Sequence, residues 1–385
     1  MAEPIHDRVV VVAGHICLDL IPRFESTDGT AALRPGELVN VGEAILATGG
    51  PVSNTGLALH RLGVPTRLVA KVGDDAFGHE VQRLLRGHAP DLADGIRVDA
   101  KAATSYTVVI SPPGVDRLFL HHPGANQTFG PEDASDAVMA GASMLHFGYP
   151  PLMRRFFAEG PGPMVELYER AHAQGLATSL DACGIDPTSE AGGADWRVWL
   201  TQVMPHTDLF SPSLDELRVM LGHGPVEPAV DIDLVTAAAD ELLGMGVAIV
   251  AIKLGEHGLL LRAADNPQRL QRLAHLIDMD RWAGACLYVP CFDVEVAGTT
   301  GAGDSTIAGL LTAVTLGQTP DEAIRAAVAV GACSVETVEA VTGIRPWAQV
   351  AARLAEGWPR RSTPALADWH CGHHGVWRPK HGRSE

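Results

Sequence analysis

The spacing of apolar residues alternates between strand-like and helix-like along most of this chain. Residues 8–14 form a continuous apolar run rich in valine, which is typical of a strand buried on both faces of a sheet. Downstream the leucines gather on one helical face, so Asn54 is expected to cap a helix that Gly63 ends. Further strands are expected at 66–73, 175–182, 207–213 and 247–255, with helices between them. This alternation predicts an α/β fold, a doubly wound and mostly parallel sheet flanked by helices.

One part of the chain breaks this alternation. Residues 96–121 contain short strand patterns separated by Pro-Pro-Gly, which predicts an antiparallel hairpin. Together with residues 16–42, this segment is expected to form a small sheet that stands off the main body. The α/β core is then expected to comprise residues 5–15, 43–95 and 122–358.

Two other segments fit the alternation less well. Residues 262–290 form a polar, tryptophan-containing insertion, and residues 359–385 are basic and rich in proline and histidine. The histidines and the cysteine of this tail could hold a metal ion. A flexible terminus is the favoured interpretation, because chain ends are commonly poorly ordered.

Composition narrows the classes of partner. A chain of 385 residues with 46% hydrophobic content can bury a large core, and its net charge of −17 argues against a nucleic-acid partner. No apolar run of about 20 residues could span a bilayer, and the first residues lack the layout of a signal peptide. A cytoplasmic protein with no membrane partner is therefore expected. The six scattered cysteines show neither a paired zinc spacing nor a disulfide framework.

The strongest chemical pattern is the segment AGTTGAGDSTIAGLLTAV, residues 297–314. The backbone N–H groups of Gly301, Ala302 and Gly303 would lie at a helix N-terminus, which favours an anion such as a phosphoryl group. Asp304 in the same turn could accept the proton of an attacking hydroxyl. The alternative is that the glycines only make a tight turn and that the carboxylate caps the helix.

Together with GGPVSN at 49–54 and KVGDDAFG at 71–78, this segment resembles the signature regions of the ribokinase-like (PfkB) family of carbohydrate kinases. The resemblance extends from about residue 8 to residue 345. It implies an α/β nucleotide-binding core with a small β-sheet lid over the sugar.

The resemblance also implies residues that bind the acceptor. Asp19 and Asn54 match the family's sugar-binding carboxylate and amide, and Gly49 with Gly50 match the glycine pair where the lid hinges. Asn126 lies in a segment similar to the family's return from the lid, so a contact with substrate or phosphate is expected. The polar residues have a structural alternative, since Asp and Asn also cap helices or strands and make turns.

A further resemblance concerns the nucleotide. VAIVAIKLGEHGLLL, residues 247–261, is similar to the family's nucleotide-contacting turn. It implies Lys253, Gly255 and Gly258 beside the phosphates or the ribose, where a lysine can act as a point charge. A surface lysine at a strand end is the alternative for Lys253.

The sequence departs from the family pattern at Ser213, at Gly298 and at Thr306, which stands where an aromatic residue is common. Ser213 stands where the metal-and-phosphate motif usually has Asn, while Glu216 keeps the carboxylate expected to help hold hydrated Mg²⁺. Gly298 stands where many relatives have an Asp that helps bind a monovalent cation, which argues against potassium activation of the usual kind. The absence of a P-loop and of a Gly-x-Gly-x-x-Gly run after a strand weakens the P-loop and NAD-dependent hypotheses.

These patterns predict an ATP-dependent kinase that uses Mg²⁺ and phosphorylates a sugar hydroxyl, with Asp304 as general base. The lack of an arginine cluster near the matched acceptor residues favours a neutral sugar over a phosphorylated one. A nucleoside kinase of the same family and a non-catalytic sugar-binding regulator remain as alternatives. The exposed edges of a lid sheet would also suit a homodimer.

Overall fold

A computed structural model describes residues 8–24, 38–112, 118–223, 230–363 and 366–380. Eleven of its strands form one large sheet in the order β14-β15-β13-β12-β11-β10-β9-β8-β1-β4-β5. The strands from β11 to β5 pair in parallel, and the remaining pairs are antiparallel. Their bounds are β1 (Val9–Gly14), β4 (Thr66–Gly73), β5 (Ile96–Asp99), β8 (Ala142–Gly148), β9 (Ala177–Asp181), β10 (Leu209–Phe210), β11 (Ile249–Lys253), β12 (Leu259–Ala263), β13 (Cys286–Val289), β14 (Trp369–Cys371) and β15 (Trp377–Pro379).

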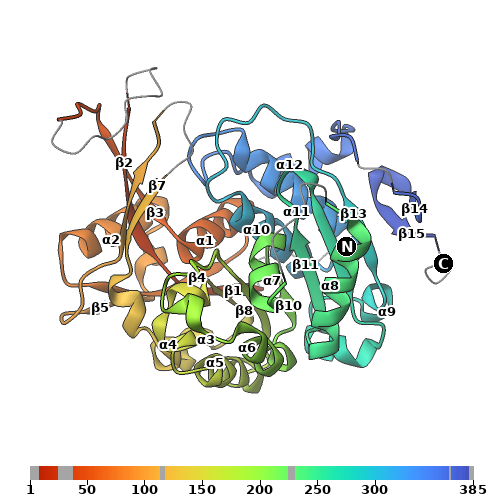
Figure 1. Ribbon diagram of the computed structural model, residues 1–385, viewed down its shortest axis with the longest axis horizontal. Coiled ribbons are helices and arrows are strands. Elements are labelled where there is room, and N and C mark those ends of the chain that lie inside the picture. Colours follow the sequence, from red (N-terminus) through yellow and green to blue (C-terminus); the bar gives the residue numbers. More distant parts are fainter. Residues whose placement is uncertain (1–7, 25–37, 113–117, 224–229, 364–365, 381–385) are drawn as a thin grey trace.

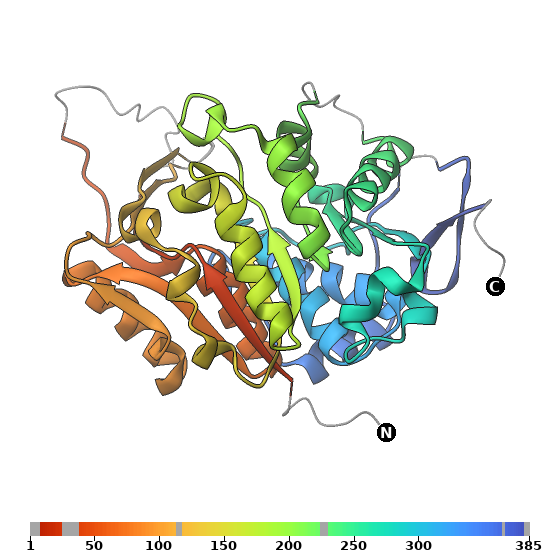
Figure 2. The ribbon, with the colours of Figure 1, turned by 90° about the horizontal axis from the view of Figure 1, so that it is seen from below.

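Helices cover both faces of this sheet, as the sequence predicted (Figure 1). The reason is visible in β1, where Val10 and Val12 pack into the core on one face and Val11 and Ala13 into the core on the other. The first core includes α1 (Pro51–Leu62), α2 (Ala76–His88), α9 (Met279–Trp282), α10 (Ala302–Thr315), α11 (Pro320–Val335) and α12 (Trp347–Ala355). The second includes α3 (Asp136–Met139), α4 (Arg154–Phe157), α5 (Gly162–Ala173), α6 (Trp196–Val203), α7 (Leu214–Leu221) and α8 (Ile232–Met245). Figure 2 shows the two helical layers from another side.

A second sheet, called the small sheet below, rises from one end of the molecule (Figure 1). It has the order β3-β2-β6-β7, built from β2 (Cys17–Pro22), β3 (Ala44–Gly49), β6 (Tyr106–Ile110) and β7 (Leu118–His122). Residues 25–37 of the expected lid lie outside the described residues.

The boundaries of the small sheet differ from the expected ones. Residues 96–99 were expected in the lid, but they form β5, which pairs in parallel with β4 at the edge of the large sheet. Ile96 is buried in the main core, and that contact fixes the strand there. Conversely, residues 44–49 were expected in the core, yet they pair with β2 as part of the small sheet.

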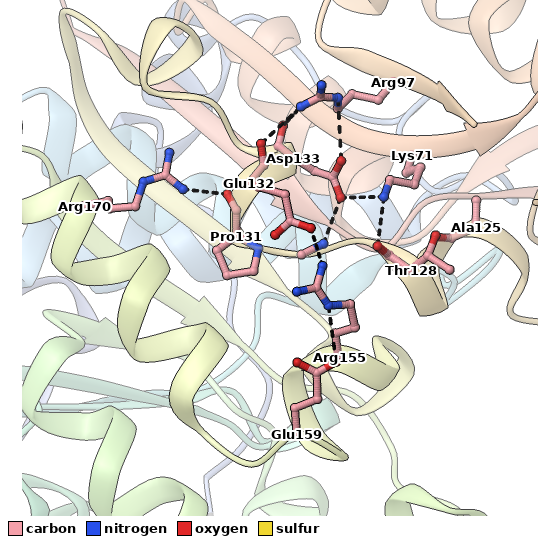
Figure 3. A network of polar contacts seen from close by, with 11 residues as sticks. Lys71, Arg97, Ala125, Thr128, Pro131, Glu132, Asp133, Arg155, Glu159 and Arg170 are labelled. Atoms are coloured by element: carbon pink, nitrogen blue, oxygen red, sulfur yellow. Dashed lines mark hydrogen bonds and ion pairs between the residues drawn. The ribbon is translucent and has the colours of Figure 1, made fainter. Parts of the chain in front are cut away.

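A polar network ties the return from the small sheet to the core (Figure 3). After β7 the chain makes two 3₁₀ turns, Gly124–Thr128 and Pro131–Asp133. Asp133 Oδ2 lies 2.6 Å from Lys71 Nζ on β4, and the same ammonium donates to the Thr128 carbonyl at 2.8 Å. These contacts hold the entrance and exit of the small sheet at fixed places on the core.

The C-terminal tail also differs from the expectation. Residues 359–385 were expected to be flexible, but the described part contains β14 and β15, which extend the large sheet beside β13. Trp369 and Val376 are buried, and the Trp369 indole donates to Asp233 Oδ1 at 3.0 Å. Two well-placed apolar residues thus anchor a segment whose composition is otherwise polar.

The described residues contain neither a membrane-spanning helix nor a cluster of metal ligands. No helix among them is long and apolar enough to cross a membrane. In the same part of the chain, no group of three or more His, Cys, Asp or Glu residues is arranged to hold a metal ion, and this includes the described histidines of the tail.

Replacing Trp369 by alanine should lower the free energy of unfolding by about 3 kcal/mol, because it removes a buried indole and its hydrogen bond. Urea denaturation followed by circular dichroism measures the change. The neighbouring exposed residue provides the control, since His370→Ala should change stability by less than about 0.5 kcal/mol. Equal urea midpoints for the wild type and the Trp369 variant would contradict the packing of the C-terminal segment against the core.

Candidate active site

The carboxyl ends of neighbouring parallel strands meet at one edge of the large sheet. His15 follows β1, Tyr149 follows β8, Asp181 ends β9 and Lys253 ends β11. Open α/β sheets bind their ligands at this edge, because the strand ends and the loops after them converge there. The structure therefore brings four chemically useful side chains to one place.

The predicted glycine-rich segment forms the start of α10 at this same edge. Gly301 is the residue before the helix and has a φ of 69°, in the left-handed region that favours glycine. A Cβ there would also come within 2.6 Å of the Ala340 side chain. Ala302 begins the helix, and its N–H donates to the Thr299 carbonyl at 3.3 Å. A helix start of this kind leaves backbone N–H groups without partners inside the helix and carries the positive end of the helix dipole, although the Ala302 N–H already has this long hydrogen bond.

Asp304 lies in that turn and is 2% exposed. Asn54 Nδ2 donates to its Oδ2 at 2.9 Å, and the Tyr149 hydroxyl lies 3.1 Å from both carboxylate oxygens. A weaker contact joins Thr55 Oγ1 to Oδ1 at 3.4 Å. Burial raises the pKa of Asp304, while the hydrogen bonds from Asn54 and Tyr149 and the charge of Lys253 pull that pKa back down. The carboxylate is thus held in place and kept more basic than an exposed aspartate.

Asn54 reaches this carboxylate from α1, which packs beside α10 (Figure 1). The helix begins at Pro51, earlier than the expected cap at Asn54, so that the Asn54 amide points at Asp304 rather than at the helix end. Gly50 precedes the helix with a φ of 87°, and a Cβ there would lie 2.6 Å from His15 Nδ1. A side chain at residue 50 would therefore push α1 away from the strand ends.

Asp19 on β2 and Gly49 on β3 lie close together in the small sheet, although the register pairs Asp19 with Ala47 and Gly49 with Cys17. A Cβ at Gly49 would collide with the Asp19 carboxylate, so the glycine makes room for it. Cys17 Sγ donates to Asp19 Oδ1 at 3.3 Å. Burial raises the pKa of Asp19 to about 6, and the hydrogen bonds from Cys17 and Thr107 oppose that rise.

Asn126 has a different environment from the expected ligand contact. It is fully buried, its Nδ2 donates to the Ile16 carbonyl at 2.8 Å, and its Oδ1 accepts from the Ile16 N–H at 3.3 Å. This side chain braces the return segment against the crossing from β1 to β2. The amide keeps a second N–H and a second oxygen lone pair, so the expected contact with substrate stays a prediction.

Lys253 is not a surface lysine. Its ammonium lies 2.7 Å from Asp181 Oδ1, and the lysine side chain is 12% exposed. Burial lowers the pKa of Lys253, but the charges of Asp181 and Glu216 outweigh burial and raise the pKa overall. Asp181 Oδ2 is buried and has no hydrogen-bond partner among the described residues.

Glu216 sits in the first turn of α7, next to Ser213. Glu216 Oε2 accepts from the Ser213 N–H at 2.6 Å, and Ser213 Oγ accepts from the Glu216 N–H at 3.2 Å. The serine that stands in place of the usual Asn therefore forms a capping box with Glu216. The same carboxylate acts electrostatically on Asp181 and Asp304.

A cavity of about 330 Å³ opens beside the start of α10. It is lined by Lys253, Gly255, Glu256, Gly258, Cys291, Phe292, Val294, Val296, Thr299, Ala302, Gly303, Thr306, Val328, Gly331, Ala332, Val335 and Arg361. The three residues predicted to contact the nucleotide thus share one cavity with four residues of the glycine-rich segment, among them Ala302 and Gly303. The lining combines the charged side chains of Lys253, Glu256 and Arg361 with apolar side chains of α11, which suits a ligand with charged and apolar parts.

Two site residues were missed by sequence reasoning. Tyr149 has a φ of 66°, an uncommon conformation for a large side chain, and it points its hydroxyl at Asp304. The sequence signal is Gly-Tyr-Pro-Pro at the end of a buried strand. His15 is buried, and neither of its ring nitrogens has a hydrogen-bond partner among the described residues. Its ring centroid lies 5.3 Å from that of His121 and 6.2 Å from that of Tyr149.

Comparisons with known proteins identify the family and the fold. The model of the pfkB family carbohydrate kinase matches residues 7–347. Fructokinase-2 of Solanum lycopersicum is 24% identical over 365 residues, which cover 91% of this chain and 96% of that protein. A ribokinase from Thermotoga maritima has a TM-score of 0.66 at 20% identity, over 90% of this chain and 99% of that one. A ribokinase from Arabidopsis thaliana, complexed with ribose and ATP, has a TM-score of 0.66 at 19% identity, over 90% and 98%.

The class of protein follows from this agreement. The expected ribokinase-like fold is confirmed, and so is the expected enzyme class, an ATP-dependent carbohydrate kinase. The chain belongs to the pfkB family of carbohydrate kinases.

Replacing Tyr149 by phenylalanine should lower kcat by about 10-fold, because the carboxylate loses a donor that holds it. That donor also lowers the pKa of Asp304, so its loss raises the pKa and moves the acid limb of the pH–rate profile to higher pH. Steady-state kinetics with an accepted sugar from pH 5 to 9 would measure both effects.

Tyr168→Phe is the matched control for this experiment. Tyr168 is another buried tyrosine, but it donates to the Ser179 carbonyl at 2.7 Å rather than to Asp304. This variant should keep the wild-type pH profile even where its stability falls. A shift of the same size in both variants would show that Tyr149 has no specific link to the base.

Proposed function

We propose that this chain transfers the terminal phosphoryl group of ATP to a hydroxyl of a neutral sugar, with Asp304 as general base. The observation that carries the proposal is a buried carboxylate of raised pKa in the first turn of α10, where helix N–H groups border a cavity. Such a carboxylate can take the hydroxyl proton, and the N–H groups can stabilise negative charge that develops on the transferred group. The residues Gly301, Ala302 and Gly303 are proposed to form that anion hole.

The cavity beside α10 is the proposed ATP site. Its apolar walls suit a base, and Lys253, Gly255 and Gly258 lie where phosphates or ribose would sit. A solved structure with the same fold, described as a putative ribokinase II from E. coli, contains ATP and Mg²⁺. That ligand set supports ATP as the donor.

The donor set suits a Mg²⁺ ion at this place. Asp181 Oδ2 is a buried oxygen with no hydrogen-bond partner among the described residues. Glu216 supplies a second carboxylate, whose charge acts on the pKa of Asp181. We propose that these two residues hold the hydrated ion, which when bound supplies positive charge to the nucleotide phosphates. Gly298 has no side chain with which to bind a monovalent cation, so activation by such an ion stays doubtful.

The acceptor is proposed to lie between the small sheet and the core, bound by Asp19, Gly49 and His15. Burial lowers the pKa of His15 to about 3, so this ring is neutral at pH 7 and carries one donor and one acceptor. A sugar hydroxyl can pair with both kinds of group, and it would satisfy ring nitrogens that otherwise lack partners. Neutral imidazole and a carboxylate give little to bind a phosphorylated sugar. The expected contacts of Asn54 and Gly50 with the acceptor remain predictions.

A nucleoside is the second candidate acceptor. The rings of His15, His121 and Tyr149 lie close together at the proposed acceptor site, and such rings can stack against a base. The curated fructokinase relatives favour the sugar.

The homodimer through the small sheet stays a prediction. In that sheet β7 lies at the edge and leaves Leu118 and Leu120 about half exposed.

Replacing Asp304 by asparagine should lower kcat by about 10²- to 10⁴-fold, since the amide cannot accept the hydroxyl proton. Release of ADP in a coupled assay measures the rate, and calorimetry of a non-hydrolysable ATP analogue shows whether the nucleotide still binds. Asp186→Asn, at an exposed carboxylate, is the control and should leave the rate unchanged. Wild-type activity in the Asp304 variant would rule out the assigned base.

The acceptor can be identified by its effect on thermal stability. With a non-hydrolysable ATP analogue present, a neutral sugar that is a substrate should raise the melting temperature, whereas its phosphorylated form should not. The panel should include fructose, ribose, their monophosphates and adenosine. A rise with adenosine alone would favour the nucleoside kinase. Binding of a sugar without any ADP release would favour the non-catalytic regulator.

A further inference from the structure

One residue that lines the proposed ATP site lies outside the part of the chain that matches the family. The match ends at residue 347, yet Arg361 lines the cavity beside α10. This residue belongs to the segment that was expected to be a flexible tail. Its position puts a cationic side chain at the cavity proposed to bind ATP.

Arg361 is held at the cavity by a set of well-defined contacts. Its N–H donates to the Cys291 carbonyl at 2.9 Å. The preceding Arg360 has its guanidinium 4.3 Å from the centroid of the Phe292 ring and donates to the Pro290 carbonyl at 3.1 Å. Trp358 stacks on the same Phe292 ring at 4.4 Å. The backbone next to the cavity is thus fixed, so the Arg361 side chain starts from a defined place at the cavity.

The charges around the cavity leave this guanidinium available. Lys253, the other cation of the cavity wall, is engaged at 2.7 Å by the buried carboxylate of Asp181. Arg361 is engaged by Glu256 at 2.9 Å, but here both side chains are largely exposed, 45% and 66%. Exposed ion pairs contribute little to stability, so Arg361 can exchange its partner at small cost.

We propose that Arg361 binds an anionic oxygen of the ATP phosphates, so that the C-terminal extension supplies a nucleotide contact. A guanidinium can donate two parallel hydrogen bonds to a phosphate, which a solvated lysine cannot do in the same way. Arg361 also offsets the charge of Glu256, which would otherwise stand alone at the cavity wall and repel the nucleotide. This inference rests on the proposed function, in which ATP occupies this cavity.

Isothermal titration calorimetry with the full-length protein tests the inference without relying on catalysis. Arg361→Ala should weaken binding of a non-hydrolysable ATP analogue and of ADP by about 10-fold, and it should leave binding of adenosine unchanged. The loss should shrink at high salt, because it is electrostatic. Arg361→Lys should recover part of the affinity.

The control is an equivalent ion pair elsewhere. Arg154 pairs with Glu190 at 2.7 Å with similar exposure, 49% and 55%, and it does not line the cavity, so Arg154→Ala should bind the ATP analogue as wild type does. If the wild type binds no nucleotide, the proposed function fails together with this inference. If the wild type binds and Arg361→Ala binds equally well, this inference alone fails. An equal loss for adenosine would also overturn it, because the contact would then be to the nucleoside.

A double variant separates direct contact from simple neutralisation of Glu256. If Arg361 binds phosphate, Arg361→Ala combined with Glu256→Gln should still bind the ATP analogue several-fold more weakly than Glu256→Gln alone. Equal affinity of the double variant and of Glu256→Gln would mean that the arginine acts only by offsetting the glutamate, and the phosphate contact would be overturned.

Discussion

A buried carboxylate at the positive end of a helix is the interaction on which the rest of this site depends. Asp304 has lost its hydration, so it requires protein donors. The donors that contact it most closely, Asn54 and Tyr149, are neutral. An arginine in their place would hold the carboxylate equally well but would lower its pKa much further and make it a poor base. Neutral donors fix the position of the group and leave most of its basicity.

The same interaction explains why the site needs the whole fold. Asn54 lies on α1 and Asp304 on α10, 250 residues apart in sequence, and Tyr149 enters from the end of β8. Their meeting depends on close packing of α10 between α1 and α11. Gly309 shows how close that packing is, since a Cβ there would lie 2.8 Å from the Ala326 carbonyl on α11. Small residues along these helices therefore matter for the site, because close packing brings Asp304, the proposed base, within reach of its donors.

Local sequence patterns predicted those parts of the structure that depend on neighbouring residues alone. The alternation of strands and helices and the turn from Gly301 to Asp304 are of this kind. The strand β5 has only four residues, and one of them is buried. Its hydrophobic pattern is therefore too short to predict which sheet the strand joins. The role of Asn126 could not be read from its sequence, because a buried amide that braces a backbone looks, in sequence, like an amide that binds a ligand. Tyr149 was missed because its role depends on a backbone conformation that no periodicity reveals.

The balance of charge at the strand ends links the site to its substrates. Lys253 lies among three carboxyl groups, those of Asp181, Glu216 and Asp304. The charge of Glu216 acts on the pKa of Asp181, of Asp304 and of Lys253. Burial, together with the charges of Glu216 and Asp304, raises the pKa of Asp181. Because negative charge is in excess, a free polyphosphate would be repelled from this corner, whereas a phosphate accompanied by a divalent cation would relieve the excess. This cluster of carboxyl groups is the physical basis of the proposal that Asp181 and Glu216 hold a divalent cation beside the nucleotide.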